Sequence, residues 1–204
     1  MDAAPDPRDE PTERLVRGVS DGDVAHFNAL YERLAPSLYT WADLRIGHKL
    51  RTWLEPADLV QEVWFRALRS LDAFDPDTTS FRYWVFRVAK NALLEALRKS
   101  ESAGRGAWQA AGDGQPNALE QVPDSITGVS RRLARGEEVE RFRGFVAGLD
   151  EEDQELVIHI GLEGMSHAQV GTRLDLLPKT VTKRWQRLRE RLAQAGDLQQ
   201  LLAD

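Results

Sequence analysis

The 204-residue chain contains no cysteine, so disulfides, cysteine-ligated zinc sites and thiol chemistry are excluded. No apolar run is long enough to cross a membrane, and the first residues, MDAAPDPRDEPTER, lack the apolar core of a secretory signal. Sustained alternation of apolar and polar residues, the pattern typical of strands, is also scarce. These absences predict a helical protein of the cytoplasm that does not insert into membranes.

The sequence also lacks the signatures of catalysis. The histidines His26, His48, His159 and His167 show no metal-ligand spacing. There is no glycine-rich phosphate loop and no G-x-S-x-G motif. We therefore expect no catalytic residue, no metal site and no cofactor, and a protein that is not an enzyme.

The charge is unevenly distributed along the chain. The formal net charge of −6 argues against general affinity for nucleic acid. Cations nevertheless dominate two segments, with six against one anion over residues 178–191 and five against one over residues 82–99. Acidic residues gather elsewhere, as in residues 150–153. This asymmetry predicts two defined contact faces.

Helical periodicity is the dominant pattern in the sequence. Apolar residues recur at steps of three and four in segments that predict helices at 23–46, 57–71, 81–99, about 131–148, 151–162, 166–174 and 178–195. Pro36 should bend or split the first helix, and Ser80 should cap the third. Residues 72–79 are expected to form a loop.

The predicted fold class is all-α, with two small helical domains joined by a flexible linker. The glycines between the two groups of helices favour a linker over residues 101–136. The first domain is then expected over 21–100 and the second over 137–195. We interpret residues 1–20 as a flexible N-terminal segment and residues 196–204 as a C-terminal tail.

Residues 165–192, MSHAQVGTRLDLLPKTVTKRWQRLRERL, predict a helix-turn-helix. Ser166 should cap a first helix with an apolar face of Ala168, Val170 and Leu174, and Pro178 should begin the second. The second helix carries an apolar stripe, Val181, Trp185, Leu188 and Leu192. Its opposite face, named here the reading face, consists of Lys179, Thr180, Thr182, Lys183, Gln186 and Arg187. Such side chains contact base edges and phosphates, although a solvated basic helix would have a similar composition.

Residues 57–71 predict an amphipathic helix with a polar stripe of Asp58, Gln61, Glu62, Arg66 and Arg69. Phe65 lies among these charges by helical spacing. An aromatic side chain surrounded by charge is typical of a protein interface. The alternative is that Phe65 packs on a neighbouring helix.

The helix predicted over residues 81–99 interleaves aromatic side chains with cations, a combination that suits stacking on unpaired bases while phosphates are held. Trp84 also falls on a plausible core stripe, so a structural role for it stays open. The residues off that stripe, and therefore better candidates for contact, are Tyr83, Arg87, Lys90, Asn91 and Arg98.

The ordered set DLVQEVWFRAL, SFRYWVFRVAKN, a linker and TVTKRWQRLRERL resembles the extracytoplasmic-function sigma factors of the sigma-70 superfamily. The resemblance covers about residues 21–100 and 137–193. It implies a subunit that binds core RNA polymerase and directs promoter recognition, DNA melting and transcription initiation. The expected partners are promoter DNA, the beta-prime clamp helices and beta flap of the polymerase, and an anti-sigma factor or other regulator. The free chain is expected to be a monomer.

The resemblance also implies roles for individual residues. Core-polymerase binding falls to Asp58, Gln61, Glu62, Phe65 and Arg66. Binding of the minus-ten element falls to Asp75, Ser80, Tyr83, Trp84, Arg87, Lys90, Asn91 and Arg98. Binding of the minus-thirty-five element falls to the reading face, Lys179, Thr180, Thr182, Lys183, Gln186 and Arg187.

Five residues depart from the family pattern. Glu95 stands where aspartate is usual, Gly171 where alanine is usual and Asp175 where glycine is usual, and Lys179 and Lys183 replace small residues. A second interpretation of the chain is a stand-alone helix-turn-helix regulator that binds operators as a dimer. It would share the second domain, but it does not explain the DLVQE helix, and the sequence shows no dimerisation heptad.

Overall fold

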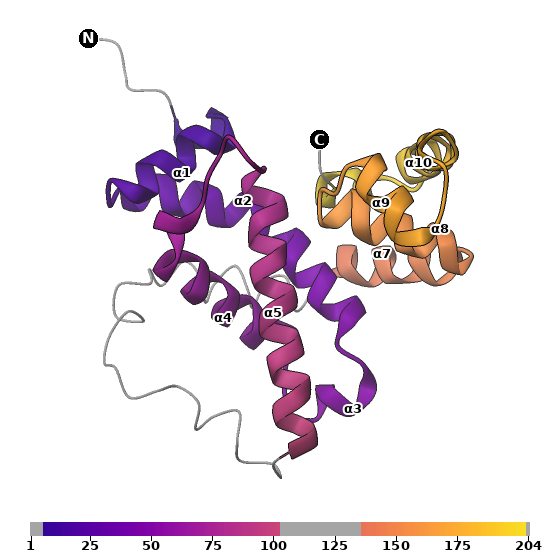
Figure 1. Ribbon diagram of the computed structural model, residues 1–204, viewed down its shortest axis with the longest axis horizontal. Coiled ribbons are helices and arrows are strands. Elements are labelled where there is room, and N and C mark those ends of the chain that lie inside the picture. Colours follow the sequence, from indigo (N-terminus) through magenta and orange to yellow (C-terminus); the bar gives the residue numbers. More distant parts are fainter. Residues whose placement is uncertain (1–5, 103–135, 203–204) are drawn as a thin grey trace. The chain divides into compact units, whose positions relative to one another are not determined.

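The computed structural model of the chain describes residues 6–102 and 136–202. Within these ranges the chain is helical and contains no strand, which confirms the predicted all-α class (Figure 1). The chain divides into two compact units, Met1–Arg132 and Leu133–Asp204. No helix in the described ranges is long and apolar enough to cross a membrane. The predicted linker, including Trp108, lies almost entirely outside the described residues.

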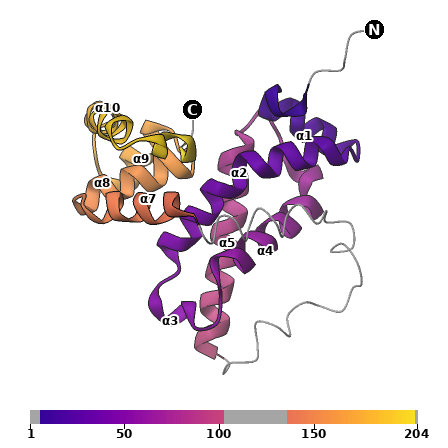
Figure 2. The same cartoon turned by 180° about the vertical axis from the view of Figure 1, so that it is seen from behind.

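The first unit is a bundle of helices around an aromatic core. Its helices are α1 (Thr12–Ser20), α2 (Val24–Arg45), α3 (His48–Arg51), α4 (Pro56–Arg69) and α5 (Phe81–Ser102). The indole of Trp64 on α4 lies edge-on to Phe27, with ring centroids 5.7 Å apart, and 5.2 Å from Tyr31, both on α2. Phe81 at the start of α5 also contacts Trp64. These buried contacts hold α2, α4 and α5 together. Figure 2 shows the three helices side by side.

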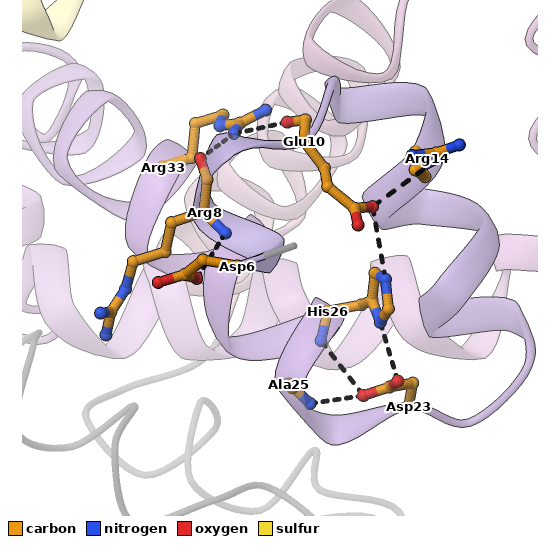
Figure 3. Close-up of polar contacts among 8 residues, drawn as sticks. All are labelled: Asp6, Arg8, Glu10, Arg14, Asp23, Ala25, His26 and Arg33. Carbon is orange, nitrogen blue, oxygen red and sulfur yellow. Dashed lines mark hydrogen bonds and ion pairs between the residues drawn. The ribbon is translucent and has the colours of Figure 1, made fainter. Parts of the chain in front are cut away.

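The prediction of a flexible segment over residues 1–20 is wrong for its second half. Residues Thr12–Ser20 form α1, and Leu15 and Val16 are buried. The Arg33 guanidinium donates to the backbone carbonyls of Arg8 and Glu10, at 2.9 and 2.8 Å, and so holds the chain before α1 against α2 (Figure 3). The polar composition of residues 1–20 favoured disorder, because ordering a chain costs conformational entropy. Burial of Leu15 and Val16, together with the hydrogen bonds from Arg33, offsets that cost.

A second group of polar side chains joins Glu10, just before α1, to the start of α2 (Figure 3). The His26 ring lies between two carboxylates, with Nδ1 2.8 Å from Asp23 and Nε2 3.5 Å from Glu10. Asp23 caps α2, and its hydrogen bonds with His26 and with the backbone amide of Ala25 lower the pKa of its carboxyl. The stretch just before α1 is therefore held to α2 by both Arg33 and His26.

Pro36 does not split the first predicted helix, because α2 runs without interruption from Val24 to Arg45. A proline inside a helix costs about 3 kcal/mol. Its neighbours Leu34, Ala35 and Leu38 are at most 2% exposed. We attribute the continuity to this packing, which stabilises the helix on both sides of the proline.

The second unit is a smaller bundle that ends in the helix-turn-helix. Its helices are α7 (Glu137–Ala147), α8 (Glu151–Leu156), α9 (His167–Leu174) and α10 (Pro178–Gln194). A π-helical turn, Val157–Leu162, continues α8. A 3₁₀ turn, Asp197–Leu201, follows α10 and buries Leu198 and Leu201. The interpretation of residues 196–204 as a tail is therefore wrong for its described part, because apolar residues at 198, 201 and 202 belong to the core.

A buried polar cluster lies beneath α9. His159 is fully buried, with Nδ1 2.7 Å from the buried carboxylate of Glu163 and Nε2 2.9 Å from Glu155. The Nε of Arg173 on α9 also lies 2.9 Å from His159 Nε2. With Nδ1–H donating to Glu163 and Nε2 accepting from Arg173, both ring nitrogens of the buried imidazole are hydrogen-bonded, and Arg173 connects α9 to the π-helical turn.

Candidate nucleic-acid and polymerase interfaces

The turn between α9 and α10 has a specific geometry. Ser166 and Gln169 form a reciprocal capping box at the start of α9. Asp175 ends the helix in the left-handed conformation, with φ of 56°. The Leu176 amide donates to the Gly171 carbonyl at 2.9 Å, and a Cβ on Gly171 would lie 2.7 Å from the Leu176 carbonyl oxygen. The turn therefore folds back tightly onto α9, and only glycine leaves room for it.

The two faces of α10 are divided as the sequence predicts. Val181, Trp185, Leu188 and Leu192 are buried. Every residue of the reading face is exposed: Lys179, Thr180, Thr182, Lys183, Gln186 and Arg187. On α9 the predicted apolar face holds only in part, because Val170 is buried and Leu174 half-buried, but Ala168 is exposed.

The Thr182 hydroxyl is already engaged within the protein. It donates to the Pro178 carbonyl at 2.9 Å and lies 3.0 Å from Nδ1 of His167 on α9. A hydroxyl has a single hydrogen to donate. In this arrangement the single hydroxyl hydrogen of Thr182 is used within the protein, so the Thr182 hydroxyl has no hydrogen left to donate to a partner.

Arg184 connects α10 to the start of α8. Its guanidinium meets three carboxylates at the start of α8: Asp153 at 2.8 Å, Asp150 at 3.0 Å, and Glu152. Burial, and then the neighbouring charge of Asp150, raise the pKa of the Asp153 carboxyl. The sequence showed Arg184 only as one cation of a basic segment. Its carboxylate partners lie more than thirty residues away and could not be identified from the sequence.

The polar stripe of α4 lies at the surface of the first unit. Asp58 is exposed, and Gln61, Glu62, Phe65 and Arg66 are half-buried. The Arg69 guanidinium sits over the Phe65 ring, 5.3 Å from its centroid. The stripe therefore presents carboxylate, amide and aromatic groups on one helix surface.

Two members of this stripe belong to a charge network that joins α4 to α5. Arg66 donates from Nε to Glu62 at 2.6 Å and from Nη1 to Glu95 at 2.7 Å, and Lys99 lies 2.8 Å from the other Glu95 oxygen. Hydrogen bonds from Lys99 and Arg66 lower the pKa of Glu95. Burial lowers the pKa of Arg66, but its bonds to Glu62 and Glu95 outweigh burial and raise it overall.

The second candidate face lies on α5 and the loop before it. Ser80 accepts a hydrogen bond from the Tyr83 amide at 3.3 Å, so it caps α5 as predicted. Arg87, Asn91 and Arg98 are exposed, and Tyr83 and Lys90 are half-buried. These residues lie along one helix and combine cationic, amide and aromatic groups.

Two other residues predicted on this face have contacts within the protein. The Trp84 indole is half-buried and packs against Phe74 and Phe81, with centroids 5.5 and 5.4 Å away. The Asp75 carboxylate accepts from the Asp77 amide at 2.9 Å and shapes the loop. Both residues therefore have a structural role, whatever else they contact.

Comparison with known proteins finds one matching family, sigma-70 region 2, over residues 30–103. The matched segment contains both the polar stripe of α4 and the cationic face of α5. Among curated proteins, the chain is 28% identical to the RNA polymerase sigma factor NccH of Alcaligenes xylosoxydans xylosoxydans, covering 88% of this chain and 91% of that protein.

A second curated protein and one solved structure are also similar to the chain. The chain is 27% identical to the ECF RNA polymerase sigma-E factor of Escherichia coli (strain K12), over 86% of this chain and 89% of that protein. Among solved structures, the chain is similar to CnrH, solved in complex with the cytosolic domain of CnrY. The identity is 24%, the TM-score is 0.43, and the match covers 90% of this chain and 96% of that one.

Proposed function

The chain belongs to the extracytoplasmic-function group of the sigma-70 family, and we propose that it is a sigma factor that binds core RNA polymerase and directs promoter recognition, DNA melting and transcription initiation. The observation that carries this proposal is the match to sigma-70 region 2 over residues 30–103, which spans the polar stripe of α4 and the cationic face of α5. In this role the chain is a regulatory subunit that acts in the cytoplasm.

The polar stripe of α4 is the proposed docking surface for the clamp helices of the beta-prime subunit. Asp58, Gln61 and Glu62 supply hydrogen-bond acceptors, and Phe65 supplies apolar area in their midst. Aromatic side chains contribute much of the energy at protein interfaces, and charges set the register. The region from about 21 to 100 is the proposed polymerase-binding and minus-ten domain.

The α5 face is the proposed contact for the opened minus-ten element. Arg87, Lys90 and Arg98 can hold phosphates, and Asn91 can pair with a base edge. Tyr83, which is half-buried near the start of the helix, can stack on an unpaired base. Ser80 and Asp75 support this face by capping α5 and shaping its loop.

The reading face of α10 is the proposed contact for the minus-thirty-five element in the major groove. All six of its side chains are exposed, and the five besides Thr182 are Lys179, Thr180, Lys183, Gln186 and Arg187. Residues 137–195 are the proposed domain for this element. The beta flap of the polymerase and an anti-sigma factor or other regulator are further proposed partners, and the free chain is proposed to be a monomer.

The net charge of −6 fits a factor that reaches promoters with polymerase and binds DNA weakly alone. Fluorescence anisotropy with promoter duplexes would measure both states. Holoenzyme should bind tightly, and the free chain should bind at least about a hundredfold more weakly at physiological salt. Equal affinity of the free chain and the holoenzyme for promoter DNA would contradict the proposal that the chain binds promoters mainly as part of the holoenzyme.

A further inference from the structure

Arg66 was predicted to contact the polymerase, but its guanidinium is bound by two carboxylates of its own unit. Its Nε donates to Glu62 Oε1 at 2.6 Å, and its Nη1 donates to Glu95 Oε2 at 2.7 Å. A planar guanidinium held at both of these nitrogens has a fixed orientation. Arg66 is therefore poorly placed to reorient toward a partner, and well placed to fix its neighbours.

Glu62 is the member of this network that faces the proposed polymerase interface. One carboxylate oxygen, Oε1, is bound by Arg66, while Oε2 makes no hydrogen bond to the described part of the chain. A glutamate side chain that is free in solution loses rotamer freedom when it binds. Arg66 has already restricted Glu62 before a partner arrives, so that loss is smaller.

Glu95 completes the arrangement from α5. It accepts Arg66 Nη1 on one oxygen and Lys99 Nζ on the other, and so anchors the guanidinium that orients Glu62. Isolated surface ion pairs contribute little to folding stability. The consequence of this network should therefore be seen in binding more than in stability.

We propose that Arg66 and Glu95 are positioning residues that hold the Glu62 carboxylate in one orientation, with Oε2 presented to a cation or N–H donor on core polymerase. This inference rests on the proposed function, because it assigns the polymerase as the partner of Glu62. Neither Arg66 nor Glu95 contacts the polymerase in this arrangement. Both act through Glu62.

The test is the affinity of full-length variants for purified core polymerase, measured by fluorescence anisotropy of the labelled chain. Glu95→Ala should weaken binding by about threefold to tenfold, the range expected when one ordered side chain is released. Glu95→Gln keeps an acceptor for Arg66 and should lose less. In a Glu62→Ala background, Glu95→Ala should have no further effect.

Glu32 on α2 provides a matched control. Its side chain is 40% exposed, against 41% for Glu95, and it forms an ion pair with an arginine, Arg8, at 3.0 Å. Glu32→Ala removes the same charge from the same unit and should leave the affinity unchanged. Circular dichroism of each free variant should show an unchanged helical content, which separates positioning from unfolding.

Three results would overturn the inference while leaving the proposed function intact. Glu95→Ala could leave the affinity unchanged, it could weaken binding equally in the Glu62→Ala background, or Glu62→Ala alone could have no effect. The second result would mean that Glu95 contacts the polymerase directly. A wild-type chain that does not bind core polymerase at all would instead refute the proposed function, and the inference with it.

Discussion

Replacing Gly171 with alanine should destabilise the helix-turn-helix, although alanine is the usual residue of the family at this position. The added Cβ would lie 2.7 Å from the Leu176 carbonyl oxygen and 3.6 Å from the Pro178 nitrogen. The obstructing atom is backbone, held in place by the hydrogen bond from the Leu176 amide to the Gly171 carbonyl. No side-chain rotation can therefore relieve the contact.

The expected cost follows from two opposing effects. Overpacking typically costs about 1–3 kcal/mol. Alanine is favoured over glycine inside a helix by about 1 kcal/mol. The contact with backbone places the steric cost toward the upper end of its range, so we expect a net loss of about 1–2 kcal/mol.

Urea denaturation of the full-length chain, followed by circular dichroism, would measure the free energy of unfolding. Hydrogen–deuterium exchange would show whether the loss is confined to peptides from α9 and α10. A matched variant is Gly144→Ala on α7, where a Cβ would meet nothing within 4 Å and alanine should stabilise. Stabilisation by Gly171→Ala of the same size as by Gly144→Ala would refute the close approach described for the turn.

Three further outcomes are expected. Asp175→Gly should raise stability by about 0.5–1 kcal/mol in urea denaturation, because glycine adopts the left-handed conformation without strain; unchanged stability would show that the Asp175 side chain compensates. Glu95→Gln should lower the free energy of unfolding at neutral pH by a small amount. The folded-state pKa of Glu95 is depressed below 4.5, so the stabilisation by its carboxylate is present above that pH and is lost as pH falls through the folded pKa. A stability difference between Glu95→Gln and wild type that persisted at pH 2 would contradict this origin. Gly18→Ala should loosen α1, because its Cβ would lie 2.3 Å from the His26 ring; exchange of α1 amides should accelerate, and unchanged protection would count against the contact.

Periodicity in the sequence was sufficient to predict most of the helices and the orientation of α10. The steps of four, three and four between Val181, Trp185, Leu188 and Leu192 allow a single buried side, and the structure has that side buried. Local signals also identified the caps at Ser80 and Ser166, because capping depends on residues within one turn.

Features that depend on contacts distant in sequence were missed. Helix α1 has a short apolar stripe, and its stability comes from packing on α2 and from Arg33, more than twenty residues away. The same holds for Arg66, whose partner Glu95 lies on another helix, and for Arg184, which reaches the start of α8. The charge of a residue and its position on a helix predicted that its side chain is exposed. They did not predict whether its N–H groups already donate hydrogen bonds to other residues of the protein.

The assignments of individual residues to polymerase, minus-ten and minus-thirty-five contacts stay predictions. For the reading face, exposure of all six side chains is a necessary condition that is met. For Thr182, Asp75 and Trp84, contacts within the protein define a structural role that composition and spacing could not reveal.

The most direct test of the account is transcription in vitro with the purified chain, bacterial core RNA polymerase and a library of genomic fragments. The control is the double variant Gln61→Ala and Glu62→Ala, which removes two half-buried polar groups from the polar stripe of α4. The account predicts discrete start sites with the wild-type chain and their loss with the variant. No start sites, together with operator binding by a dimer of the free chain, would contradict it and favour a stand-alone regulator.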